Sequence, residues 1–166
     1  MDISKEILKV AFAAESDAAQ PLATTKHGQR SPADHWSPAV LLERAAHLSK
    51  LAHHGDGSAG ETLKEFPRHC AMLSFRSRDG QAEVHENFAD VFYVLEGRTT
   101  LVTGGTVADA TNTGPGETRG SAVVGGARQE LRSGDVAHVP AGLPHQMLVA
   151  NGQTVTCLVM KVQENS

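Results

Sequence analysis

The sequence predicts an all-β domain, either a sandwich or a closed barrel, preceded by an N-terminal helical arm. Short apolar runs separated by turn dipeptides begin at about Phe66. The stretch from Val136 to Met160 has no Asp, Glu, Lys or Arg, but Pro140 and Pro144 interrupt it. Such a stretch fits the strands of a closed β core and excludes a membrane-spanning helix. One segment before this region has helical periodicity.

Length and composition indicate one ordinary globular domain. The chain has 166 residues, of which 40% are apolar and 20% charged, with a formal net charge of −4. That balance predicts no partner among nucleic acids or anionic membranes. The two cysteines, Cys70 and Cys157, are too few for a disulfide framework or a metal knuckle. Asp2 and Glu6 precede a short apolar run, which is not a secretory signal, so we expect a cytoplasmic protein.

The helical arm is predicted from capping and periodicity. Ser37-Pro38 is a typical helix start, and Gly55 is a typical stop. Between them, apolar residues recur on one face, which predicts a helix packed on the outside of the β domain. We therefore divide the chain into an arm with a linker (1–60, the linker from residue 55) and a barrel (61–166). The apolar face comprises Leu41, Ala45, Leu48 and Ala52.

Turn dipeptides predict three β-hairpins in the barrel region. Asp79-Gly80, Glu96-Gly97 and Asn151-Gly152 each separate two strand-like runs. Asp-Gly and Asn-Gly favour the type I′ turn, which needs positive φ at both central residues. The intervening segment 104–132 is rich in Gly and Thr, and we interpret it as a long surface loop with one short strand near Val123-Val124.

Two groups of spaced residues remain after the common enzyme motifs are excluded. The chain has no P-loop, dinucleotide fingerprint, G-x-S-x-G, HExxH or CxxC. Residues two apart on a strand share a face, so Glu83 and His85 project together, and a closed barrel can bring residues of both groups to one interior point. The groups are Glu83-x-His85-x4-Asp90-x6-Gly97 and Gly134-x5-Pro140-x-Gly142-x2-His145.

These groups resemble the two conserved motifs of the cupin superfamily, G-x5-H-x-H-x(3,4)-E-x6-G and G-x5-P-x-G-x2-H-x3-N. The second group matches every position except the last, where Val149 replaces Asn. The first group matches in spacing, but Ser77 stands at the leading Gly, Glu83 at the first His and Asp90 at the Glu. The resemblance extends over about 72–162.

The resemblance implies a cupin-type jelly-roll barrel that holds one divalent transition metal. Carried over by position, the metal ligands are His85, Asp90 and His145, with Glu83 in place of the missing His. Imidazole and carboxylate donors suit Fe(II), and Mn, Ni and Zn are also acceptable. A second carboxylate makes the donor set harder, which favours Mn or Fe over Cu.

Two residues have alternative roles at this point. Glu83 is either a fourth metal ligand or a general base. A two-residue hairpin loop at Asp79-Gly80 places Arg76 directly across from Glu83, which predicts a cross-strand ion pair. The same position allows Arg76 to anchor the carboxylate of a substrate. For His138, on the strand of the second motif, we expect a supporting or surface role.

The function predicted from the sequence is an enzyme that acts on a small polar molecule, either a carboxylate or a sugar-like compound. Oxygenase, isomerase and decarboxylase chemistry all remain open, and metal dependence is expected. The alternative is a non-catalytic cupin that binds a small ligand, with a structural metal or none. A purely scaffolding barrel is a third possibility. We also expect a homodimer in which residues 31–54 pack on the partner subunit.

Overall fold

The structure of the protein is a computed structural model that describes residues 33–164. Within this range the chain forms one helix, twelve strands and their connections, and every strand pair is antiparallel. The elements are α2 (Pro38–His54), β1 (Ser58–Glu65), β2 (His69–Arg76), β3 (Ala82–His85), β4 (Phe88–Thr103), β5 (Thr106–Ala108), β6 (Thr111–Gly114), β7 (Glu117–Gly120), β8 (Ala122–Val124), β9 (Ala127–Arg132), β10 (Val136–Val139), β11 (His145–Leu148) and β12 (Val155–Gln163).

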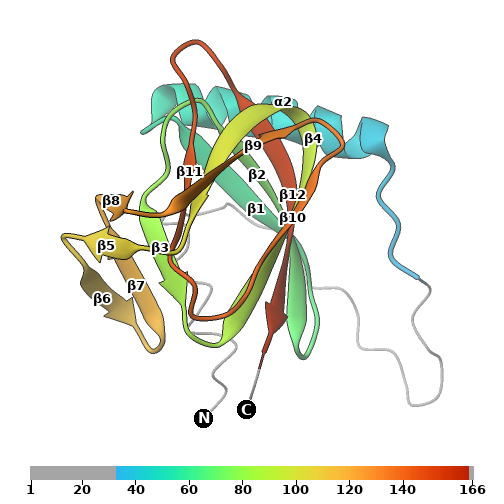
Figure 1. Cartoon of the computed structure of the whole chain (residues 1–166). Helices are drawn as coiled ribbons and strands as arrows, with labels where there is room; N and C mark the ends of the chain where they lie inside the picture. Colours follow the sequence, from blue (N-terminus) through green and yellow to red (C-terminus); the bar gives the residue numbers. More distant parts are fainter. Residues whose placement is uncertain (1–32, 165–166) are drawn as a thin grey trace.

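The long strand β4 belongs to two sheets and joins them (Figure 1). Its first part pairs with β10 and β12, and β12 continues through β2 to β1. Its second part pairs with β9 and β11, and β11 continues through β3 and β7 to β6. The two sheets thus curl into the predicted barrel, and a separate pair, β5 and β8, lies beside it.

The interior of the barrel is mainly apolar away from the site described below. Both sheets contribute, so the core closes the space between them. Val94, Val139, Val155 and Cys157 are almost completely buried there. The cluster comprises Met72, Phe92, Val94, Leu101, Leu131, Val139, Met147, Val149, Val155, Cys157 and Val159.

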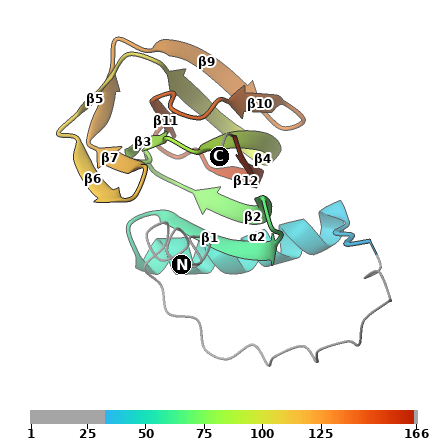
Figure 2. The ribbon, with the colours of Figure 1, turned by 90° about the horizontal axis from the view of Figure 1, so that it is seen from below.

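Helix α2 lies against the outside of β1 and β2, away from β9 and β10 (Figure 2). It begins as predicted, with the Ser37 side chain accepting a hydrogen bond from the backbone N of Val40, and the four residues predicted to share its apolar face are all buried. They pack with Leu73 and Phe75 of β2. The apolar face of the helix is therefore used within the chain, as predicted for a helix packed on the outside of the β domain.

The predicted linker before the barrel is partly wrong, because β1 already begins at Ser58. This strand pairs with β2 over its whole length, from Ser58 opposite Arg76 to Glu65 opposite Cys70. None of its residues is fully buried, and the strand is rich in Gly, Thr and Glu, so the sequence pattern did not indicate a strand here.

None of the three predicted hairpins forms, although each dipeptide changes the direction or the sheet of the chain. Strands β2 and β3, on either side of Asp79-Gly80, lie in different sheets, and Gly80 instead donates to the carbonyl of Met147. Gly97 has φ 82° inside the continuous strand β4, at the point where the strand changes sheets. Asn151-Gly152 forms a tight turn, with Gln153 donating to Ala150, but it also connects two sheets. In this barrel such dipeptides lie where the chain passes from one sheet to the other, and not between two paired strands.

The sequence pattern predicted a long surface loop over 104–132, and this prediction is wrong. The segment contains the five strands β5 to β9. Strand β8 includes the predicted Val123-Val124. The other strands are rich in Thr, Gly and charged residues, and β9 is exposed except for Leu131. Because the apolar alternation of a half-buried strand is absent, the pattern did not indicate them.

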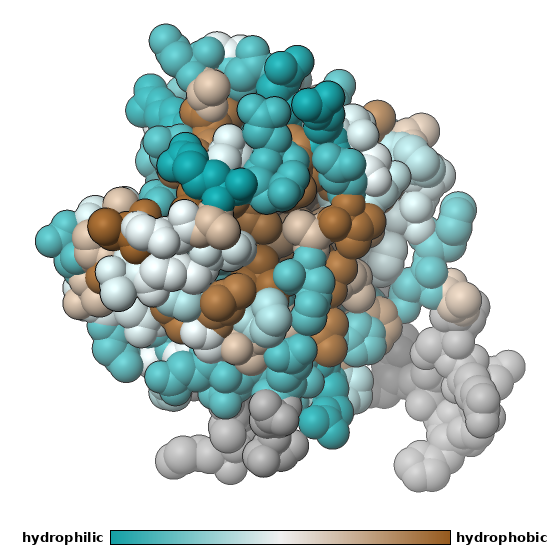
Figure 3. Space-filling model, viewed as in Figure 1, coloured by the Kyte–Doolittle hydropathy of each residue, from teal (hydrophilic) through white to brown (hydrophobic). Residues whose placement is uncertain are grey.

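The molecular surface is mainly hydrophilic around the edge of the face in Figure 3, with apolar residues near its middle. Tyr93 and Val136 are cross-strand partners, and Val40, Leu42 and Leu51 all lie on helix α2. Among the described residues, no helix has the length and apolarity that crossing a membrane requires. The exposed large apolar residues are Val40, Leu42, Leu51, Tyr93, Val124, Val136 and Val162.

Candidate metal centre

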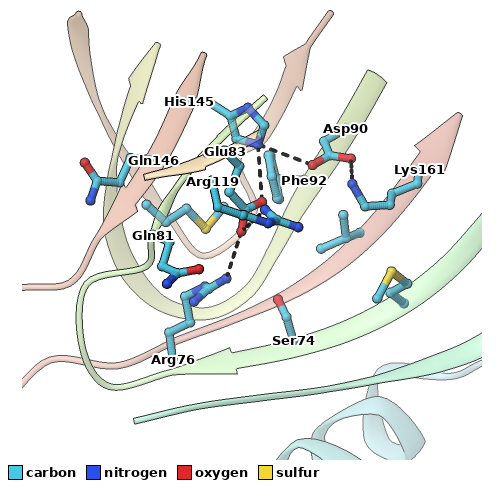
Figure 4. A pocket seen from close by; sticks show the side chains of 13 residues that line it. Ser74, Arg76, Gln81, Glu83, Asp90, Phe92, Arg119, His145, Gln146 and Lys161 are labelled. Atoms are coloured by element: carbon cyan, nitrogen blue, oxygen red, sulfur yellow. Dashed lines mark hydrogen bonds and ion pairs between the residues drawn. The ribbon is translucent and has the colours of Figure 1, made fainter. Parts of the chain in front are cut away.

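Four predicted site residues meet inside the barrel. Strand β3 carries Glu83 and His85, β4 carries Asp90, and β11 begins at His145, which pairs with Glu83. One donor atom of each side chain lies within 4.8 Å of the donor atoms of the other three. The two histidines are 2% and 3% exposed, so residues more than fifty positions apart in sequence face one buried point. Figure 4 shows His145, Glu83 and Asp90 directed toward one another.

The Nε2 atoms of both histidines have no hydrogen-bond partner among the described residues. For His85, Nε2 is 3.4 Å from Oε2 of Glu83 and 3.4 Å from Oδ2 of Asp90. For His145, the same oxygens lie at 3.8 Å and 3.4 Å. A buried polar atom without a partner costs about 1–3 kcal/mol, so such atoms in a native structure indicate a missing ligand or another explanation.

This donor set fits a divalent transition metal. Donors that bind one ion at about 2.1 Å lie roughly 3.0–3.4 Å from one another, which is close to the distances here. Two imidazoles and two carboxylates are also a donor set that Fe, Mn, Ni and Zn accept. An ion at this point would satisfy both orphaned nitrogens at once.

The two carboxylates each offer one oxygen to the centre and the other to a cation. Oε1 of Glu83 is 2.6 Å from Nη1 of Arg119, and Oδ1 of Asp90 accepts from Nζ of Lys161 at 2.8 Å. Their remaining oxygens, Oε2 and Oδ2, face the two histidines. Salt-bridge formation and metal ligation by Glu83 are therefore compatible, since each uses a different oxygen.

Arg76 lies near Glu83, but for a different reason than predicted. Its Nη2 is 4.0 Å from Oε1 of Glu83, which is a loose ion pair. The expected register between Arg76 and Glu83 is wrong: Arg76 is opposite Ser58 and Val155, in the other sheet. The two side chains approach across the barrel interior, and the strand partners of Glu83 are Arg119 on β7 and His145 on β11.

Backbone and side-chain acceptors fix the orientation of both imidazoles. Nδ1 of His85 is 2.7 Å from Oε2 of Glu117, and Nδ1 of His145 is 3.1 Å from the carbonyl oxygen of Leu143. When each Nδ1 donates its proton outward, the unprotonated Nε2 faces the centre, which is the form that binds a metal. His138, by contrast, lies on the surface of β10, 53% exposed and 3.6 Å from Glu164.

Three charged residues of the site were missed by the sequence analysis: Glu117, Arg119 and Lys161. Glu117 and Arg119 lie on β7, in the segment interpreted as a loop. Lys161 follows a run of apolar residues in β12 and is opposite Asp90. The available signal was the two-residue spacing of Glu117 and Arg119, which places both on one face of a strand.

Burial and charge act in opposite directions on the ionisation of the site. Burial would lower the pKa of His85, but the surrounding carboxylates outweigh it and raise the pKa to about 10. Burial would raise the pKa of Glu83, yet His85 and Arg119 hold it below its usual range. In the metal-free protein the surrounding carboxylates thus stabilise the protonated form of His85. The carboxylates that raise the pKa of His85 are Asp90, Glu117 and Glu83.

A pocket opens on the centre and combines cationic and apolar walls (Figure 4). Glu83, Asp90 and His145 line it together with Arg76, Arg119 and Lys161. The amide of Gln146 is used structurally, since it donates to the carbonyl of Gly80. The lining residues are Met72, Ser74, Arg76, Gln81, Glu83, Asp90, Phe92, Arg119, His145, Gln146, Met147, Val159 and Lys161.

Comparisons with known proteins identify the fold. No protein-family model and no curated protein matches the sequence. The solved structure of TT1209 from Thermus thermophilus is 20% identical and superposes with a TM-score of 0.50, over 75% of this chain and 95% of that one.

Two further solved structures are more distant. The polyketide cyclase RemF from Streptomyces resistomycificus is 22% identical with a TM-score of 0.46, over 65% of this chain. The cupin domain of Cnp3 from Schizosaccharomyces pombe is 13% identical with a TM-score of 0.48, over 64% of this chain. The chain spans 66% and 65% of the lengths of these two proteins. With its two curled sheets and its motif residues facing one interior point, the chain has a cupin-type jelly-roll barrel fold.

Proposed function

We propose that the protein is a divalent-metal-dependent enzyme that acts on a small molecule carrying a carboxylate. The two buried, unpartnered Nε2 atoms of His85 and His145 carry the proposal. They would bind the metal together with Oδ2 of Asp90 and Oε2 of Glu83. Fe, Mn, Ni and Zn all suit this donor set. When bound, the metal supplies Lewis-acid chemistry and a template for substrate, the general roles of such an ion.

Glu83 is assigned as a metal ligand and not as a general base. His85 and Arg119 keep its pKa below the usual range although burial opposes them, so its carboxylate is a weak proton acceptor at neutral pH. The same interactions leave Oε2 free toward the histidines.

The charge of the pocket favours an anionic substrate. Arg76, Arg119 and Lys161 balance the carboxylates of Glu83, Asp90 and Glu117 one for one. A divalent ion with neutral imidazoles then leaves an excess of two positive charges in a site where His85, Asp90 and His145 are buried. A carboxylate substrate would offset this excess. A neutral sugar-like compound would not.

Arg76 is the residue proposed to anchor that carboxylate. Its guanidinium is only loosely paired, at 4.0 Å from Glu83, and its side chain is 19% exposed where it lines the pocket. Arginine can present two parallel N–H donors to a carboxylate, which fixes the orientation of the substrate. Phe92 and Met147 line apolar parts of the same pocket and would exclude water around the rest of the molecule.

Metal analysis tests the proposal. The protein is purified without added metal, loaded separately with Fe, Mn, Ni and Zn, and its metal content is measured by mass spectrometry. We expect near-stoichiometric metal in the wild type and its loss in His85→Ala and His145→Ala. The matched control is His138→Ala, a barrel histidine on the surface, which should keep the metal. A wild-type protein that takes up none of the four metals would overturn the proposal.

Turnover then separates an enzyme from a non-catalytic binder. The metal-loaded protein is incubated with a panel of small keto- and hydroxy-acids, and oxygen uptake and product formation are followed. Consumption of one acid that is lost in Arg76→Gln supports the enzyme. Binding of an acid without any product would instead support the ligand-binding alternative.

A further inference from the structure

Strand β7 pairs with β3 and carries a charged residue opposite each of the two β3 residues that face the centre. In the antiparallel register Arg119 is opposite Glu83, and Glu117 is opposite His85. Cross-strand partners on one face of a sheet lie close enough to interact directly. Each of the two β3 residues that face the metal centre therefore has its own charged partner on β7.

Glu117 contacts Nδ1 of His85, the ring nitrogen that does not face the centre. Its Oε2 lies 2.7 Å from Nδ1 of His85, and the residue is only 6% exposed. A neutral imidazole has one protonated and one unprotonated nitrogen. Because a buried carboxylate can only accept, it selects the form with the proton on Nδ1 and the lone pair on Nε2.

Arg119 links this carboxylate to the other β3 residue. Its Nη1 is 2.6 Å from Oε1 of Glu83, and its Nη2 is 3.6 Å from Oε2 of Glu117. The side chain is 12% exposed, so both contacts are shielded from water. One planar guanidinium thus restrains two carboxylates, which a lysine ammonium could not do with the same geometry.

We propose that Glu117 and Arg119 are positioning residues that hold His85 and Glu83 in the geometry for metal binding. The inference rests on the proposed metal function. Neither residue is a metal ligand itself: Glu117 is directed to Nδ1 of His85, and the guanidinium of Arg119 is a cation. They act through the ligands that they touch, and outer partners of this kind typically contribute 10–100-fold to metal affinity.

The experiment measures the affinity for Zn²⁺ alone by competition with a chromophoric chelator, in the full chain. Glu117→Gln removes the charge, and Glu117→Asp keeps the charge but shortens the side chain away from Nδ1. Arg119→Lys keeps the charge but loses the planar guanidinium that contacts both Glu83 and Glu117. We expect each of the three to raise the Kd for Zn²⁺ about 10–100-fold. The control Glu130→Gln, in an exposed pair with Arg132 on β9, should leave the Kd unchanged.

A second measurement separates positioning from general electrostatics and from damage to the fold. In ¹⁵N-labelled, Zn²⁺-loaded wild type we expect a slowly exchanging Nδ1 proton on His85, and its loss or rapid exchange in Glu117→Gln. Circular dichroism checks that each variant is folded. If Glu117→Asp and Arg119→Lys bind Zn²⁺ as the wild type does, the effect is one of charge only and the inference is overturned.

The outcomes distinguish this inference from the proposed function. Zn²⁺ binding by the wild type, lost in His85→Ala but unchanged in all three β7 variants, leaves the metal centre standing and overturns the positioning role. Failure of the wild type to bind Zn²⁺ or any other tested metal overturns both.

Discussion

Nζ of Lys161 on β12 lies 2.8 Å from Oδ1 of Asp90 on β4, and the two residues are direct cross-strand partners. Asp90 is 3% exposed, and the Lys161 side chain is 14% exposed, so the pair is almost completely withdrawn from water. Burial would raise the pKa of Asp90, but the Lys161 charge and the two histidines hold it well below its usual range. Lys161 thus keeps ionised a carboxylate whose other oxygen faces the metal centre.

Substitution of one member of this pair should lower the free energy of unfolding more than substitution of both members together. Asp90→Asn leaves a buried ammonium without its partner, and Lys161→Met leaves a buried carboxylate without its cation. We expect the free energies of unfolding of the two single variants and the double variant, measured with urea on the metal-free protein at pH 7, to give a coupling of about 1–3 kcal/mol. Additive effects would contradict the pairing.

Alkaline pH should destabilise the metal-free protein through His85. Its pKa is raised from 6.5 to about 10, so the folded state holds a proton that the unfolded state has lost in this interval. The stabilisation is complete below about pH 6.5 and disappears as the pH rises through about 10. We expect the urea midpoint of the wild type to fall between pH 6.5 and 10 by more than that of His85→Gln, which lacks the titrating ring. Parallel pH dependences would contradict the assignment.

Gly97 should be sensitive to substitution because it is the corner at which β4 changes sheets. Its φ is 82°, and an added Cβ would overlap the carbonyl oxygen of Thr154. Gly104 is a matched control, with φ 77° and open space where an added Cβ would lie. We expect Gly104→Ala to cost about 1–2 kcal/mol from backbone strain alone, and Gly97→Ala to cost clearly more. Equal costs, measured by urea unfolding, would mean that the corner is not tightly packed.

Substitution of Arg76 should weaken the binding of small carboxylic acids without removing the metal. In calorimetric titrations of the metal-loaded protein, we expect Arg76→Gln to raise the Kd for the best-bound keto- or hydroxy-acid at least about tenfold, since a charged hydrogen-bonding partner is lost. Arg132→Gln, an exposed arginine on β9, is the control and should bind as the wild type does. An unchanged Kd in Arg76→Gln would contradict the proposal that Arg76 binds the carboxylate of the substrate.

The sequence was sufficient to predict the helix from local patterns, and the meeting of the two histidines followed from the resemblance to the two cupin motifs. The helix has its capping serine and four apolar residues at helical spacing, and all of these occupy the predicted positions. Glu83 and His85 share a face by strand alternation, and the second motif places His145 at the start of a strand. These features require no knowledge of which strands pair.

Strand pairing and the outer residues of the site could not be predicted in the same way. Asp79-Gly80 and Asn151-Gly152 connect sheets because the barrel closes through non-local contacts, and a turn dipeptide carries no information about them. Glu117 and Arg119 lie on a strand without apolar alternation, and their role follows only from its pairing with β3. Lys161 likewise becomes part of the site through its register with Asp90.

The central claim is that one metal ion binds between His85 and His145, and crystallography with anomalous scattering tests it most directly. Crystals of the protein loaded with Zn²⁺ are measured on both sides of the zinc absorption edge. The account predicts one strong anomalous peak within bonding distance of both Nε2 atoms and of oxygens from Asp90 and Glu83. No peak at this point, or a peak bound only by surface groups such as His138, would contradict it.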